Sequence, residues 1–212
     1  MASTLGDLKQ RIITEVNRDD LADDLATELN TLIAQAIDEY AVTPFWFNSF
    51  TRTDVNAVAG SQYVTIPDDV RDIQYVWVLI GGTRYIMRKL PETRIISLYT
   101  TPINGQPTDF SQINQTLHVW PTPNVAYPLI MQVVEDVTPA LDYSDDTSAN
   151  AWTDTRIGQP LIKACVKQML YRDHLRAAAG SSLAPRDEDD AYSKLRGESN
   201  KRIGTGRVAA SW

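Results

Sequence analysis

Cysteine and histidine, which supply many metal ligands and catalytic groups, are scarce in this sequence. Cys165 is the single cysteine among 212 residues, so no intrachain disulfide can form and a secreted fold held by disulfides is excluded. His118 and His174 are the two histidines, and they lack the one-turn spacing of a zinc-binding pair. We interpret both as packed or solvated residues and expect no metal site and no cofactor.

Positive charge and long apolar runs are also lacking. The net charge is -7, which argues against a dedicated nucleic-acid binder, because such proteins present a basic face. The longest strongly apolar run, Tyr75–Ile80, is far too short to span a bilayer. The polar start Met1–Thr4 has no apolar signal core. We expect synthesis in a cytoplasm and no association with a membrane.

The remaining reactive groups form no convincing catalytic arrangement. Cys165 has Leu161, Ile162, Val166 and Met169 as helical neighbours, which predicts a buried thiol. The paired carboxylates fall in predicted loops and helix starts, where they remain solvated or complement the helix dipole. Gly204-Thr205-Gly206 follows no strand and opens no helix, so it predicts no phosphate site. We expect a protein that is not an enzyme; an acidic hydrolase using carboxylates of 142–154 is the alternative.

The first part of the chain, residues 1–44, has a helical pattern. Thr4 and Asp7 resemble a capping pair, and apolar residues then recur at helical spacing from Leu5 to Val16. A second apolar stripe runs from Leu25 to Tyr40 and ends before Pro44, which cannot continue a helix. The pattern predicts two helices.

Residues 45–137 have a β-rich pattern. Gly81-Gly82 is typical of a two-residue hairpin turn between strands 72–80 and 84–87, and Pro91 predicts the start of a short helix over 92–99. Residues 116–120 and 129–134 are expected to pair as antiparallel strands. The strand at 72–80 is apolar on both faces, which favours a sandwich or a helix that covers the sheet.

Residues 138–197 are expected to form an acidic loop and further helices. The loop covers 142–154, a long helix covers 157–179 and ends at Gly180-Ser181-Ser182, and a shorter helix covers 187–195. The fold class is therefore predicted as α+β: amino- and carboxy-terminal helices packed as a bundle, with an inserted antiparallel, sandwich-like β-rich region.

Residues 198–212 are expected to form a flexible basic tail. Since the whole chain carries -7 and residues 194–212 carry +4, the remaining residues carry -11. A basic tail on an acidic body is typical of a segment that docks on a partner. A frayed terminus is the plainer interpretation.

The aromatic run Phe45-Trp46-Phe47 also has two interpretations. We favour a core plug where the second helix meets the sheet. The alternative is a subunit contact, because aromatic side chains are enriched at the centres of interfaces.

Four stretches, taken in order, resemble the phage adaptor family, the head-to-tail connector proteins of tailed bacteriophages. The first is Asn17–Leu21, with the helix that ends at Tyr40 and the following Trp46-Phe47. The second and third are Tyr63–Arg71 and Leu117–Pro123. The fourth comprises the acidic loop, the long helix and the basic tail. Together they cover nearly the whole chain.

The resemblance implies a structural virion protein at the neck, where it forms a ring, expected to be dodecameric, between the portal and the tail. Its partners would be the portal protein, other copies of itself, and the tail nozzle or other tail proteins. Genome DNA would pass through the ring without sequence-specific binding. The alternative within the virion is a tail-completion or stopper subunit.

The resemblance also implies site residues. The tail would dock on the portal, and its contact residues would be Lys201, Arg202, Ile203, Arg207, Val208 and Trp212. An ordered groove on the partner would receive charge-assisted hydrogen bonds from the arginines and the apolar area of Trp212. The candidates for contacts between subunits are Phe45, Trp46, Phe47, Arg84, Arg88 and Lys89.

Overall fold

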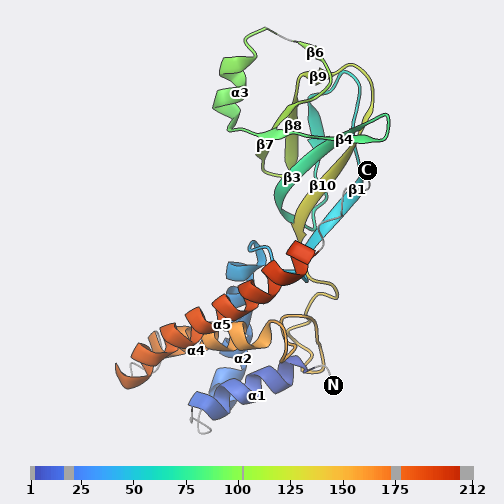
Figure 1. Cartoon of the computed structure of the whole chain (residues 1–212). Coiled ribbons are helices and arrows are strands. Elements are labelled where there is room, and N and C mark those ends of the chain that lie inside the picture. Colours follow the sequence, from blue (N-terminus) through green and yellow to red (C-terminus); the bar gives the residue numbers. More distant parts are fainter. Residues whose placement is uncertain (1–2, 17–21, 102, 173–177, 206–212) are drawn as a thin grey trace. The chain divides into compact units, whose positions relative to one another are not determined.

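A computed structural model describes residues 3–16, 22–101, 103–172 and 178–205; at 22–27, 178–185 and 203–205 it describes the backbone (Figure 1). The chain divides into two compact units. The helical unit comprises residues 1–48 and 137–212, and the β unit comprises residues 49–136. The predicted border at residue 45 therefore differs by a few residues, and Phe45–Phe47 belong to the helical unit. The predicted α+β class is confirmed.

In the described residues, four helices form the helical unit. They are α1 (Leu5–Val16), α2 (Ala22–Ala41), α4 (Gln159–Leu170) and α5 (Ala178–Thr205). Apolar residues at helical spacing give each of them a buried side, and these sides share one hydrophobic cluster. Residues from both ends of the chain meet in this cluster, including Leu8, Ile33, Phe45, Ile162 and Leu195.

The start of α1 shows the predicted capping pair. The backbone N–H of Thr4 donates to Asp7 Oδ2 at 3.0 Å, and the N–H of Asp7 donates to Thr4 Oγ1 at 3.2 Å. The next two N–H groups donate to backbone carbonyls of the acidic loop, Leu5 to Ser148 and Gly6 to Asp146. The loop therefore satisfies donors that a helix start leaves open, and it is tied to the first helix.

Over the part of the β unit that the structure describes, two four-stranded sheets, a two-stranded pair and one short helix are found. The first sheet has the order β1 (Ser49–Ala57), β10 (Tyr127–Glu135), β3 (Val70–Ile80), β4 (Thr83–Ile86). The second has the order β2 (Tyr63–Thr65), β8 (Thr116–Trp120), β7 (Asp109–Ile113), β5 (Arg88–Lys89). A further pair joins β6 (Asn104–Gly105) to β9 (Thr122–Pro123), and α3 spans Glu92–Leu98.

The two sheets enclose a second hydrophobic cluster. The inward side chains of the first sheet include Val76, Val78 and Met131, and those of the second include Phe110 and Val119. This burial of one face from each sheet is the packing of a sandwich.

Several local predictions for the β unit are confirmed. Gly81 and Gly82 have φ values of +54° and +85° and connect β3 to β4, with Ile80 opposite Thr83. A two-residue turn with positive φ at both positions matches the twist of a hairpin, which explains the two glycines. Pro91 directly precedes α3, where its fixed φ suits a helix start.

The pairing predicted for residues 116–120 with 129–134 is wrong. Strand β8 pairs with β2 and β7, whereas β10 pairs with β1 and β3 in the other sheet. Hydrophobic alternation identifies a strand but not its partner, and the segment between these two strands crosses from one sheet to the other. The expectation that β3 is covered on both faces also fails in the described residues, because Tyr75 is 50% exposed.

The carboxy-terminal helices differ from the prediction as well. Helix α4 begins at Gln159 and ends at Leu170, and α5 already begins at Ala178 and continues through Gly180-Ser181-Ser182. These residues favour a helix end locally, but packing of α4 against α5 compensates for weak propensity. Because α5 extends to Thr205, residues 198–205 are helical and are not the start of a flexible tail.

Candidate functional site

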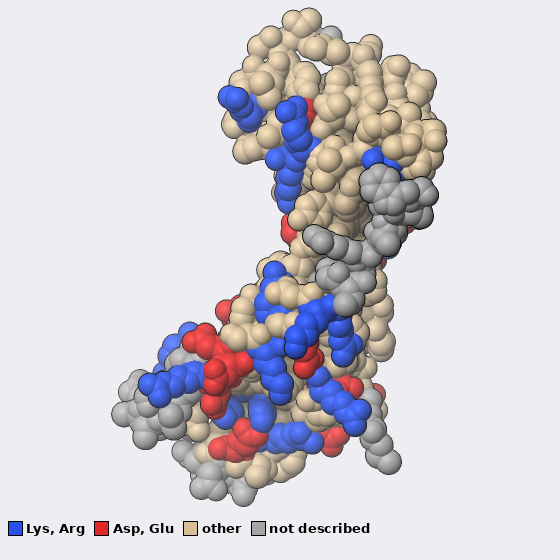
Figure 2. All heavy atoms as spheres, viewed as in Figure 1, with Lys and Arg blue, Asp and Glu red and all other residues tan. Residues whose placement is uncertain are grey.

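The last turns of α5 carry the basic residues that the sequence assigned to a tail. Lys194, Lys201 and Arg202 are exposed, and Arg196 is half-buried. Figure 2 shows Lys and Arg side chains gathered on this part of the helical unit. Positive side chains at the carboxyl end of a helix are stabilised by its dipole, so this charge is compatible with a long, regular helix.

Three contacts hold this end of α5 to residues 44–46. The guanidinium carbon of Arg202 lies 4.0 Å from the centroid of the Trp46 ring. The backbone N–H of Trp46 donates to Ser199 Oγ at 3.4 Å, and Arg196 Nη1 donates to the carbonyl of Pro44. The helix is therefore attached to its own unit as far as Arg202.

These contacts change the status of the predicted docking residues. Lys201 and Arg202 belong to an anchored helix, and Ile203 continues its backbone. Arg207, Val208 and Trp212 lie outside the described residues. Sequence reasoning missed the Arg202–Trp46 contact because nothing in the local pattern links residues so far apart in the chain.

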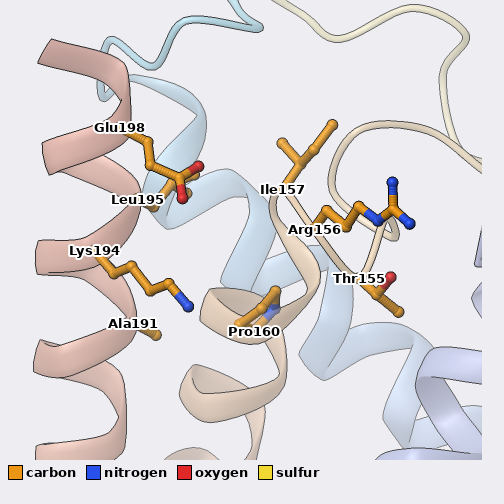
Figure 3. A pocket seen from close by; sticks show the side chains of 8 residues that line it. All are labelled: Thr155, Arg156, Ile157, Pro160, Ala191, Lys194, Leu195 and Glu198. Carbon is orange, nitrogen blue, oxygen red and sulfur yellow. The ribbon is translucent and has the colours of Figure 1, made fainter. Parts of the chain in front are cut away.

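A pocket lies between the loop that precedes α4 and the outer side of α5 (Figure 3). Its volume is about 340 Å³. Its lining includes the apolar Ile157, Pro160, Ala191 and Leu195, together with Thr155 and the charged Arg156, Lys194 and Glu198. In Figure 3 the side chains of Lys194 and Glu198 extend from α5 toward the loop. The lining holds no cysteine or histidine, so the pocket is suited to an apolar side chain flanked by charge and not to nucleophilic chemistry.

The aromatic run Phe45–Phe47 is part of the core of the helical unit. Phe45 is fully buried and stacks on Phe47 with ring centroids 5.6 Å apart. Both rings also meet Trp152 edge to face, at 5.9 Å and 4.9 Å. This burial supports the favoured interpretation as a core plug, and the plug packs among the helices and the acidic loop of its own unit.

Two of the basic candidates for subunit contacts are engaged within the chain. Arg88 donates to both carboxylate oxygens of Asp109, at 2.6 Å and 2.9 Å. Lys89 Nζ lies 3.4 Å from Asp72 Oδ1 and donates to the carbonyl of Ile73 at 2.7 Å. The third candidate, Arg84, is exposed and has no ion pair among the residues described by the structure.

The Asp109 carboxylate is the most elaborate polar centre of the β unit. It is fully buried and also accepts hydrogen bonds from Tyr99 Oη and Thr108 Oγ1. Burial disfavours the charged form, but the hydrogen bonds from Arg88, Tyr99 and Thr108 outweigh it and hold the pKa of Asp109 below its usual value. All of these partners are side chains of the same unit. The centre therefore ties Arg88 of β5 and Tyr99, at the end of α3, to Asp109 of β7.

Cys165 and His118 behave as the sequence indicates. Cys165 is buried and its Sγ lies 3.8 Å from Glu39 Oε2; burial, followed by nearby carboxylates, raises the pKa of the thiol. A thiol in this setting is a poor nucleophile. His118 packs between Tyr63 and Trp120 and lies 3.3 Å from Glu92. His174 lies outside the described residues.

The acidic loop uses its carboxylates locally. Asp142 accepts hydrogen bonds from the N–H and hydroxyl of Ser144, which lower its pKa, and Asp145 accepts the same pair from Thr147. Asp146 forms an ion pair with Lys9. Within the described ranges no group of three potential ligands could hold a metal ion, and no helix has the length and apolarity needed to cross a membrane.

Comparison with known protein families gives a match to this chain. The family model described as "SU10 adaptor protein" matches residues 3–210. No curated protein matches the chain. Because the match spans both units and nearly every residue, the chain belongs to the SU10 adaptor protein family.

Proposed function

We propose that this protein is a head-to-tail adaptor of a tailed phage: a structural component that forms a ring between the portal and the tail. The membership in an adaptor family supports the adaptor role. The ring is expected to be dodecameric, with tail proteins such as a nozzle on its other side and DNA passing through its opening.

The observation that carries the proposal is the charge and position of the last helix. Helix α5 is anchored to its own unit through Arg202, and one further basic residue, Arg207, follows the helix in the sequence. Residues 194–212 carry +4, against -11 for the other residues. An acidic groove of a partner would therefore bind this basic end of the chain next to an anchored helix.

Docking on the portal uses this segment. Arg207 supplies charge-assisted hydrogen bonds to carboxylates of the groove, and Val208 and Trp212 supply apolar area. Lys201 and Arg202 contribute long-range attraction from the end of the helix, because their backbone is already fixed.

Truncation of the segment tests the docking mechanism. A chain that ends at Thr205 keeps all of α5 and is expected to retain the circular dichroism spectrum of the full chain while losing portal binding. The matched control is Arg94→Ala, which removes an exposed positive charge in the β unit. Unchanged affinity of the truncated chain for the portal contradicts the mechanism.

A tail-completion or stopper subunit is the second candidate, since it shares the neck with the adaptor. Electron microscopy of particles assembled without the protein separates the two. Loss of an adaptor leaves filled heads that cannot accept tails or that leak DNA, whereas loss of a stopper leaves the adaptor ring on the portal.

An acidic hydrolase remains the candidate from another class. It requires carboxylates of the acidic loop, but Asp145 and Asp154 accept hydrogen bonds from neighbouring backbone groups of that loop. Replacement of Asp145, Asp146 and Asp154 by alanine abolishes an activity under that hypothesis and changes only stability or solubility under ours.

A further inference from the structure

The β unit has two outer faces that point in opposite directions. In a sandwich, alternate side chains of each strand point toward the other sheet, and the remaining side chains point outward. Val76 and Val78 of the first sheet and Leu117 and Val119 of the second are buried between the sheets. Their neighbours along each strand therefore lie on the two outer faces.

The part of the first sheet's outer face that β3 and β4 form from Tyr75 onward is apolar apart from Arg84. Strand register places Trp77 beside Ile86 and Leu79 beside Arg84. We call this surface the Arg84 face; it consists of Tyr75, Trp77, Leu79, Arg84 and Ile86. Tyr75 is 50% and Ile86 61% exposed. The combination of Tyr, Trp and Arg with aliphatic residues is that of the energetically important centre of an interface.

The outer face of the second sheet holds a pocket of about 310 Å³ under α3. We call it the aromatic pocket; its lining includes Tyr63, Glu92, Ile96, His118 and Trp120. The rings of Tyr63 and His118 meet at 4.6 Å, and those of His118 and Trp120 at 5.6 Å. Glu92 is the acidic residue of the lining, and its side chain is 40% exposed. The pocket thus offers aromatic surface beside a negative charge.

We propose that the Arg84 face of one copy packs on the aromatic pocket of the next copy in the ring, with the Arg84 guanidinium against the Glu92 carboxylate. This proposal rests on the proposed function, since it supplies the contact that a ring needs. The two surfaces lie on opposite sides of one sandwich, so each copy can use both at once. Such a heterologous contact repeats from copy to copy and closes into a ring when the rotation allows.

Charge favours this pairing over the symmetric ones. Two Arg84 faces meeting each other would bring arginines together, and two aromatic pockets would bring the Glu92 carboxylates together. Arg84 against Glu92 instead joins opposite charges beside apolar and aromatic side chains, where a guanidinium can also lie over the rings of Tyr63 or Trp120.

Contacts within the chain distinguish Arg84 from the other residues predicted to lie between subunits. Arg88 and Lys89 already have intrachain partners, and Phe45 and Phe47 are buried in the helical unit. A neighbour that recruited any of them would first have to break those contacts. Arg84 is exposed and can bind a neighbouring copy without first breaking an ion pair to another described residue of its own chain.

Disulfide trapping tests the contact in the full chain. Ile86→Cys places a thiol on the Arg84 face, and Ile96→Cys places one at the aromatic pocket; both native side chains are 61% exposed. Oxidation of the double variant is expected to give a ladder of covalent oligomers, because each copy carries both halves of the contact. Covalent oligomers accumulate even when most copies are monomeric, because each disulfide persists once it has formed. Cys165 is buried and does not compete.

The controls define the result that overturns the proposal. A variant with Ile86→Cys and Val42→Cys, a position 53% exposed in the helical unit, is expected to give no ladder. Either cysteine alone is expected to give no efficient dimer. A double variant that cross-links no better than the Val42 control, or strong dimers of Ile86→Cys alone, overturns the contact.

Charge reversal supplies a second readout. Arg84→Glu and Glu92→Arg are each expected to reduce ladder formation at least about tenfold, and the two together to restore it. Restoration separates a lost contact from misfolding, and failure to restore it in a folded variant contradicts the pairing. Portal-bound rings without a ladder would contradict this contact alone, whereas a ladder without portal binding would contradict the docking mechanism alone.

Discussion

Arg202 lies over the ring of Trp46, with its guanidinium carbon 4.0 Å from the ring centroid, and this contact joins the last turns of the chain's final helix to the segment that follows its second. The indole is half-buried, so water screens the attraction less than at a fully exposed site. The contact therefore fixes the last turns of α5 to the helical unit.

Arg202→Ala is expected to loosen the end of α5. The lost cation–π contact is worth about 0.5–1 kcal/mol, which corresponds to roughly a twofold to fivefold faster amide hydrogen exchange in the last turn. Lys201→Ala is the matched control, because it removes the same charge from the same turn and keeps the contact with Trp46. Equal exchange in the two variants contradicts a role for the ring.

Gly158→Ala is expected to destabilise the helical unit. A Cβ at this position would lie 2.7 Å from Trp152 Cα and 2.9 Å from the carbonyl oxygen of Ala151, so the backbone must shift. Overpacking of this kind costs about 1–3 kcal/mol, measured by urea denaturation. Gly197→Ala is the control: nothing lies within 4 Å of its Cβ position, and alanine in a helix gains about 0.5–1 kcal/mol over glycine.

Asp109→Asn is expected to make the β unit less stable at neutral pH, by about 1–3 kcal/mol, because a buried acceptor of charged hydrogen bonds is lost. The pKa of Asp109 is held below its usual value in the folded chain, so the carboxylate stabilises the fold above about pH 4, the unfolded value. That contribution is lost as the pH falls through the lower folded value. Denaturation between pH 7 and 3 should therefore show the wild type and the variant converging. If the stabilities of the two proteins instead change in parallel with pH, the Asp109 carboxyl is not ionised in the folded chain as assigned.

Glu135→Gln is expected to have the opposite pH dependence. Burial raises the pKa of Glu135, and Asp69 and Asp54 add to this shift while Arg52, 2.8 Å away, opposes it. A raised acid stabilises the fold most below the unfolded value of about 4.3 and loses that contribution as the pH rises through the folded value. The stability of the variant relative to wild type should therefore increase from pH 4 to 7. A relative stability that falls over this range contradicts the assignment.

The elements that the sequence predicts correctly are those with a local cause. Thr4 with Asp7, the pair Gly81-Gly82, and Pro91 each act within a few residues, and each is found at the expected start or turn. The burial of Cys165 follows from helical spacing in the same way. Short-range stereochemistry suffices to place such features.

The features that the sequence did not predict depend on contacts distant in the chain. The sequence pattern identified the strands at residues 116–120 and 129–134, but their partners are set by how the sheets close over a shared core. The partner of Arg88, Asp109, follows from the parallel pairing of β5 with β7, and the partner of Lys89, Asp72, lies in β3 of the other sheet; no local pattern reveals either contact. The aromatic pocket likewise needs α3 to lie beside β2 and β8.

The chain enters and leaves the β unit at neighbouring positions. Ser49, its first residue, pairs with Val134, and the N–H of Asp136, its last residue, donates to the carbonyl of Asp69. An inserted segment whose two ends lie side by side can be exchanged or shortened without stretching the host fold. Substitutions on the surface of the β unit can therefore accumulate during evolution while the helical unit keeps its own core.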